Sequence, residues 1–248
     1  WVDLPHDYIV AGEMSSENNN ALGFFTYENA WYRKHFTVAK EEEGSRITLL
    51  FEGVATRCVV YLNGCELKHN FCGYTSFEVD LTDYLHYGEE ENVLAVYVRY
   101  DHNEGWWYQG GGIYRHVWLI KTATVSVDLW GVCIRPELLG ETGVWRIAFE
   151  TTLRNDGYCN QEVRIVSTVL DREGRPCAQA EGTVFVSLRQ KTAVEYEPQM
   201  EQPHLWDTED PYIYTVKTAL YIGNEEIDTV YDRFGFRTFC FTADNGVI

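Results

Sequence analysis

The stretch WWYQGGGIYRHVWL, residues 106–119, decides how this sequence is interpreted. Three aromatic residues run into three glycines, and an apolar run typical of a β-strand follows them. Glycine tolerates positive φ and leaves open space above the main chain, whereas Trp and Tyr offer flat apolar faces with polar edges. Two interpretations follow. The stretch is a platform on which a sugar ring stacks, or its large side chains are a plug that fills the core beneath a β-sandwich.

Alternating apolar and polar residues on both sides of this stretch predict an all-β chain. Leu94, Val96 and Val98 share one face of an expected strand at residues 92–100. The dipeptide Asn63-Gly64 predicts a tight type I′ hairpin, because both of its residues accept left-handed dihedrals. One short helical turn is expected at residues 80–85, and no longer helix. Further strands are expected at residues 47–51, 58–62, 65–67, 117–120, 125–129, 145–153, 163–170, 183–188 and 212–222.

The composition changes near residues 121–123, where an aromatic-rich, loop-rich first half gives way to a more regular half rich in Val and Thr. The first half is long for its number of strands, which favours a jelly roll with functional loops. The second half has about seven short strands separated by turn signals, which favours an immunoglobulin-like sandwich. We therefore predict a jelly-roll β-sandwich at 1–122 and an immunoglobulin-like β-sandwich at 123–241.

Charge and composition limit the partners. The formal net charge of −18 over 248 residues argues against nucleic acid, since phosphate binding needs a basic patch. Because no apolar run approaches the ~20 residues that span a bilayer, we expect no membrane partner. The seven cysteines are odd in number and contain no CxxC pair, so we predict reduced, mostly buried thiols and a cytoplasmic location.

Motifs for metals, cofactors and nucleophiles are missing. His102 and His116 have no His or Cys partner at ligand spacing, so a zinc site has little support. The run at residues 101–104 offers oxygens for a cation, with a polar loop tip as the alternative. The three glycines superficially resemble a phosphate cradle, but a strand follows them and supplies no helix dipole. We predict no cofactor, no metal and no catalytic residue in this chain.

Six short motifs, in order along nearly the whole chain, resemble the non-catalytic front of glycoside hydrolase family 2, which includes β-galactosidases and β-glucuronidases. They are VDLPHDY at 2–8, WYRKHF at 31–36, residues 59–64 with 73–85, residues 108–119, LWDTEDPY at 205–212 and FGFR at 234–237.

The resemblance implies a sugar-binding jelly roll, then an immunoglobulin-like sandwich, then a (β/α)₈ barrel that carries both catalytic glutamates of a retaining glycosidase. On this basis residues 242–248 begin a linker to a barrel that lies outside the sequence. We therefore expect the chain alone to be inactive. Its partners would be the catalytic barrel and a carbohydrate substrate of the parent enzyme, with a homo-oligomeric parent left open.

The resemblance also nominates site residues near the glycines. In family β-galactosidases a carboxylate from this loop reaches the galactose pocket, but alignment places Trp106 there, with Asp101 or Glu104 as substitutes. Asn18, Asn19 and Asn20 offer no secure counterpart of the family's sugar-contacting asparagine. The substrate-contacting candidates are Asp101, Glu104, Trp106, Trp107, Tyr108 and Gln109.

His6, Asp7 and Arg115 are expected to lock the loop structurally, with Arg115 pairing with Asp7 or another carboxylate. The alternative is that these three residues contact substrate. Other functions remain open: a stand-alone carbohydrate-binding module, a parent enzyme acting on β-glucuronides or β-mannosides, and a plain adhesion sandwich.

Overall fold

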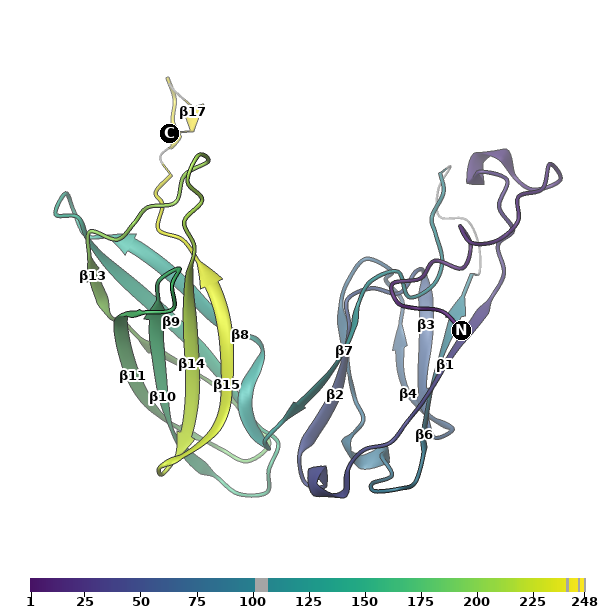
Figure 1. Ribbon diagram of the computed structural model, residues 1–248, viewed down its shortest axis with the longest axis horizontal. Coiled ribbons are helices and arrows are strands. Elements are labelled where there is room, and N and C mark those ends of the chain that lie inside the picture. Colours follow the sequence, from purple (N-terminus) through teal and green to yellow (C-terminus); the bar gives the residue numbers. More distant parts are fainter. Residues whose placement is uncertain (101–106, 240, 245, 248) are drawn as a thin grey trace. The chain divides into compact units, whose positions relative to one another are not determined.

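The computed structural model describes residues 1–100, 107–239, 241–244 and 246–247. The chain divides into two compact units, Trp1–Lys121 and Thr122–Ile248 (Figure 1). Strands dominate both units, and the described residues contain short 3₁₀ turns but no α-helix, which confirms the all-β prediction. No helix in the described part of the chain is long and apolar enough to cross a membrane.

Unit 1 is a sandwich of two sheets. Sheet 1 has the order β1-β6-β3-β4, and sheet 2 has the order β5-β2-β7. The 3₁₀ turns η1 (Asn20–Leu22), η2 (Lys40–Glu42) and η3 (Thr82–Tyr84) lie in the connections, and η3 is the predicted helical turn. The strands are β1 (Ala30–Phe36), β2 (Arg46–Phe51), β3 (Arg57–Leu62), β4 (Cys65–Asn70), β5 (Phe77–Asp80), β6 (Asn92–Arg99) and β7 (Val117–Thr122).

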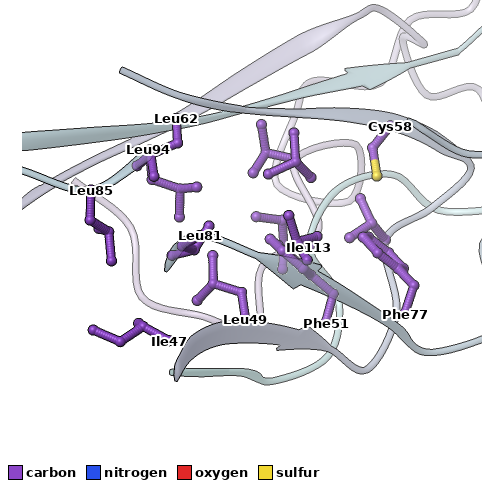
Figure 2. Close-up of a cluster of buried hydrophobic side chains, with 14 of the residues drawn as sticks. Ile47, Leu49, Phe51, Cys58, Leu62, Phe77, Leu81, Leu85, Leu94 and Ile113 are labelled. Atoms are coloured by element: carbon purple, nitrogen blue, oxygen red, sulfur yellow. The ribbon is translucent and has the colours of Figure 1, made fainter. Parts of the chain in front are cut away.

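The core of unit 1 forms where the inward faces of the sheets meet. On β6, Leu94, Val96 and Val98 are buried and alternate with more exposed residues, as predicted. The rings of Phe51 and Phe77 stack with centroids 4.9 Å apart and planes 6° apart. Figure 2 shows Ile113, just after the glycines, within this cluster, so the core fixes one end of the glycine stretch.

The Asn63-Gly64 turn joins β3 to β4 with φ of 52° and 84°, which confirms the predicted hairpin with both central residues at positive φ. The strand predicted at residues 47–51 is β2, and all of these residues are buried, so both faces of the strand are covered.

Unit 2 is a second sandwich, with one sheet of order β11-β10-β14-β15 and another of order β12-β9-β13, in which β8 also pairs with β9. Several of these strands, including β12 and β15, were not predicted from the sequence. The strands are β8 (Val125–Leu138), β9 (Val144–Asn155), β10 (Gln161–Leu170), β11 (Pro176–Val186), β12 (Lys191–Tyr196), β13 (Gln199–Glu201), β14 (Tyr214–Ile222), β15 (Glu225–Phe234), β16 (Phe241–Thr242) and β17 (Gly246–Val247).

The cysteine prediction was wrong about burial. Among the described cysteines, which are all free, Cys58 is buried in the unit 1 core, and the remainder are exposed. Cys65 and Cys133, for example, lie in strands at positions that face outward. Cysteine's preference for the interior is statistical and yields to the period of the strand that carries it.

Candidate functional site

The glycine strand, residues 110–113, is held on both sides by main-chain hydrogen bonds. On one side the N–H of His6 donates to the Ile113 carbonyl at 2.8 Å, and the N–H of Tyr8 donates to the Gly111 carbonyl at 3.0 Å. On the other side Gly112 and Ala55 exchange two hydrogen bonds of 2.9 Å each. The N-terminal segment therefore lies along the glycine strand as a short partner strand would.

The glycines are needed for this close approach, and the expected open space above them is filled. A Cβ on Gly110 would lie 2.7 Å from Oδ2 of Asp7, and one on Gly112 would lie 2.7 Å from the His6 carbonyl oxygen and would overlap the Tyr32 hydroxyl. A Cβ on Gly111 would overlap the Ile9 side chain. Residues 6–9 therefore occupy the space above the glycines that the sequence led us to expect to be open.

Asp7 connects the two segments through its carboxylate. Its Oδ1 accepts hydrogen bonds from the N–H groups of Ile9, Val10 and Gly111 at 2.9, 3.2 and 3.1 Å. Its Oδ2 accepts a short, 2.5 Å hydrogen bond from the Tyr108 hydroxyl. Hydrogen bonds to a charged acceptor are roughly twice as strong as neutral ones, so this carboxylate orients Tyr108 firmly.

Aromatic rings surround that hydrogen bond. Tyr108 contacts Phe25 and Tyr27, with centroid distances of 5.3 and 6.4 Å. Tyr27 in turn lies against Tyr100 at 4.5 Å. We call Asp7, Phe25, Tyr27, Tyr100 and Tyr108 the Asp7 cluster. Tilted ring contacts of this kind favour one fixed arrangement of the rings, so the cluster is preorganised.

The hydroxyls of this region stay protonated at neutral pH. Burial, and then the hydrogen bond and negative charge of Asp7, raise the pKa of Tyr108 well above its usual value. Burial is also the main cause that raises the pKa of Tyr8 and of Tyr32 to about 12. The phenols therefore act as hydrogen-bond donors and not as general bases.

The surface beside the cluster is aromatic. Trp107 is 60% exposed and Tyr108 36% exposed, whereas Gln109 is half-buried. An exposed indole next to a fixed phenol offers a stacking face and a polar edge, which suits the CH face and hydroxyls of a sugar ring. These described groups suit binding, because the Asp7 carboxylate already accepts four hydrogen bonds within the protein.

Two family models match the chain in succession. Glycosyl hydrolase 2 galactose-binding domain-like matches residues 2–110, and glycosyl hydrolases family 2 matches residues 126–237. The chain belongs to glycoside hydrolase family 2. The first unit is the galactose-binding-like jelly roll of this family, and the second is its immunoglobulin-like sandwich.

Relatives within family 2 are glycosidases. The β-galactosidase BoGH2A of Bacteroides ovatus is 36% identical over 99% of this chain and 29% of its own length. A β-glucuronidase of Formosa agariphila is 32% identical over 98% of this chain and 26% of its own length. A crystal structure of a family 2 member from Bacteroides cellulosilyticus superposes with a TM-score of 0.91 at 29% identity, covering all of this chain and 34% of that one. The chain thus spans about a third or less of these relatives.

The structure places the other predicted residues of this family 2 chain as follows. Asp101, Glu104 and Trp106 lie outside the described residues, as does the cation-binding run at 101–104. We expected Arg115 to pair with a carboxylate; instead its Nη1 approaches the carbonyl oxygen of Glu52 at 3.5 Å, and Asp7 is not among its described partners.

The asparagines at 18–20 serve the loop that precedes β1. The Asn18 amide donates to the Phe24 carbonyl and to the Thr26 hydroxyl, and the Asn19 side chain accepts from the N–H of Ala21 at the start of η1. These hydrogen bonds are therefore local.

Sequence reasoning missed Phe25, Tyr27, Tyr32 and Tyr100. A dense run of aromatic residues just before β1 could have indicated this cluster. The neighbouring sequence does not indicate that the run contacts a loop about 80 residues later. His6 and Asp7 were singled out, and the structure shows how they act. His6 Nδ1 lies 2.9 Å from the Tyr32 hydroxyl, and Asp7 fixes Tyr108.

Proposed function

We propose that this chain is the non-catalytic, N-terminal portion of a retaining β-glycosidase whose (β/α)₈ barrel carries the chemistry. The two β-sandwiches support that barrel, and the segment Trp107–Gln109 lines one edge of its substrate pocket. The observation that carries the proposal is the exposed Trp107 beside a Tyr108 that Asp7 holds in place. Membership of family 2 and the names of the relatives support a glycosidase.

β-Galactosides are the first substrate class that we propose, with β-glucuronides as the alternative. The relatives carry both activities in their names, at 36% and 32% identity. The test compares hydrolysis of nitrophenyl β-galactoside and nitrophenyl β-glucuronide by this chain and by the full-length enzyme. We expect turnover only by the full-length enzyme, and turnover by the chain alone would contradict the proposal.

The pocket-lining role has its own test in the full-length enzyme. Trp107→Ala removes the exposed stacking face, so we expect KM to rise about tenfold or more with a smaller change in kcat. Trp118→Ala is the matched control, because Trp118 is 51% exposed on β7 and bonds to Glu52 through its indole N–H at 2.9 Å. Equal effects of the two substitutions would show that Trp107 has no special place in the pocket.

A further inference from the structure

Sheet 1 carries aromatic side chains on the face that points away from the unit 1 core. Val60 and Val96 belong to the core cluster, and successive residues of a strand point to opposite faces. Tyr61 on β3 and Tyr97 on β6 therefore lie on the outer face. Trp31 on β1 is directly opposite Tyr97 in the strand register and shares that face.

These three rings form a contiguous group, which we call the Trp31 platform. The rings of Trp31 and Tyr97 stack with centroids 4.6 Å apart and planes 27° apart. Tyr61 lies against Trp31 at 5.7 Å with planes 36° apart. Trp31 nevertheless remains 57% exposed. Two tyrosines thus fix the orientation of an indole that the fold leaves open to solvent, so little side-chain freedom would be lost on binding.

The charged side chains beside the platform are positive, whereas the chain as a whole has a formal net charge of −18. Arg33 follows Trp31 by two residues, so it lies about 7 Å along the same face. It is exposed and stands opposite the small Ala95. Arg57 and Arg99 also face outward opposite each other, but both have interactions of their own, so we assign the charge of a ligand to Arg33.

Two acidic groups near this face, among the described residues, are engaged. Glu66 on β4 accepts a hydrogen bond from the Tyr61 hydroxyl at 3.4 Å and pairs with His69 at 2.7 Å. Glu91, just before β6, pairs with His35 at 2.8 Å. A negative ligand on Trp31 would therefore lie near the Arg33 guanidinium, and these two nearby carboxylates already have partners.

We propose that the Trp31 platform binds a uronic-acid polysaccharide. A pyranose ring of the polymer stacks on the exposed indole, and its carboxylate pairs with the planar guanidinium of Arg33, whose fork matches a carboxylate. The charge complementarity favours an acidic polymer over a neutral one.

This site is separate from the pocket edge proposed above. The platform shares no residue with the Asp7 cluster and lies on a sheet face, whereas the cluster lies on loops. Its role would be to hold a polymer and not to contact the bond that is cleaved, so its loss and the loss of glycosidase activity can be told apart.

The test is calorimetric titration of the 248-residue chain with oligogalacturonates and with uncharged β-1,4-galactan oligosaccharides of equal length. We expect the acidic ligand to bind about tenfold more tightly at low salt, and this preference to shrink as salt rises. Trp31→Ala should weaken binding about tenfold or more. Arg33→Gln should remove the preference for the acidic ligand. Trp118→Ala is the matched control and should bind as the unsubstituted chain does, whereas Trp107→Ala separates this site from the proposed pocket edge.

If Trp31→Ala fails to fold, Trp31→Tyr and Arg33→Gln test the proposal in its place. Trp31→Tyr keeps an aromatic ring on β1. The proposal is overturned if oligogalacturonate does not bind, if the Trp31 and Arg33 variants bind normally, or if only Trp107→Ala loses binding. It is also overturned if sedimentation shows a self-associated chain that Trp31→Ala converts to monomer, since a second copy would then cover the platform.

Discussion

Unit 1 and unit 2 are both β-sandwiches, but they place their polar side chains differently. Unit 1 uses a carboxylate, Asp7, to join two loop segments beside an exposed aromatic surface. Unit 2 buries hydroxyls inside its sandwich, where Tyr196 lies 2.7 Å from Thr151 and 2.8 Å from Ser167, which continues to Thr218 at 2.7 Å. The comparison indicates that the Asp7 carboxylate positions a surface of unit 1, whereas the Tyr196 hydroxyl network lies within the core of unit 2.

The largest expected effect tests whether the glycine strand of unit 1 is tightly packed, with an open turn glycine of unit 2 as the reference. Gly112→Ala should destabilise unit 1 by about 3 kcal/mol or more, because its φ is +117° and its Cβ would overlap Tyr32. Gly174→Ala in unit 2 is the control. Its φ is +82° but nothing lies within 4 Å of the new Cβ, so only about 1 kcal/mol is expected. Hydrogen exchange of peptides from each unit measures both, and equal costs would contradict tight packing at Gly112.

The second prediction concerns the buried hydroxyls of unit 2. Tyr196→Phe leaves Thr151 and Ser167 without their shared partner, so we expect unit 2 to lose about 1–3 kcal/mol. Tyr221→Phe removes an exposed hydroxyl that bonds to Glu226 at 2.8 Å, and it should cost less than about 0.5 kcal/mol. If both substitutions cost the same in urea unfolding, the network does not stabilise the core.

The third prediction tests the contact between Asp7 and Tyr108. Asp7→Asn removes the charge and one acceptor oxygen, so unit 1 should lose about 1–2 kcal/mol. Tyr108→Phe should lose about 1 kcal/mol. Both single variants lose the same hydrogen bond. The loss of stability in the double variant should therefore be about 1 kcal/mol smaller than the sum of the two single losses. Strict additivity would show that the 2.5 Å contact contributes nothing.

The smallest expected effect is a difference between the units in alkali. Burial raises the pKa of Tyr8 and Tyr32 from 10.0 to about 12, so the unfolded chain releases these protons first. Their stabilisation of unit 1 is complete below pH 10 and is lost as the pH rises through about 12. Hydrogen exchange between pH 10 and about 12 should show that peptides of unit 1 open more readily than peptides of unit 2. Tyr32→Phe should reduce this pH dependence, and an unchanged profile would exclude Tyr32 as its source.

Local features were predictable from the sequence, and the contacts of the site were not. The alternation on β6 and the Asn63-Gly64 turn follow from neighbouring residues alone, and both were predicted. The glycine strand was interpreted as open because its occupants, residues 6–9, lie about a hundred positions earlier in the chain. Arg115 was expected to seek a carboxylate, but the fold aims its guanidinium at a main-chain carbonyl.

The aromatic residues show the same limit. Trp31 was noted only as part of a family motif, since a single tryptophan in a strand pattern does not say which face it takes or which rings it meets. The strand register that brings Tyr61 and Tyr97 to it depends on three strands that are not consecutive along the chain. The composition predicted that aromatic residues are important in this chain. Pairing between strands that are distant in the sequence determines which of these residues come together.

The way in which residues 6–8 cover the glycine strand has a consequence for handling the protein. A truncation that removes the first nine residues would leave the N–H of Gly111 and the carbonyl groups of Gly111 and Ile113 without their partners. Bare main-chain groups in an extended segment act as a template for another molecule's strand. Shortened versions should therefore precipitate or pair with one another, whereas versions lengthened before Trp1 should remain dispersed.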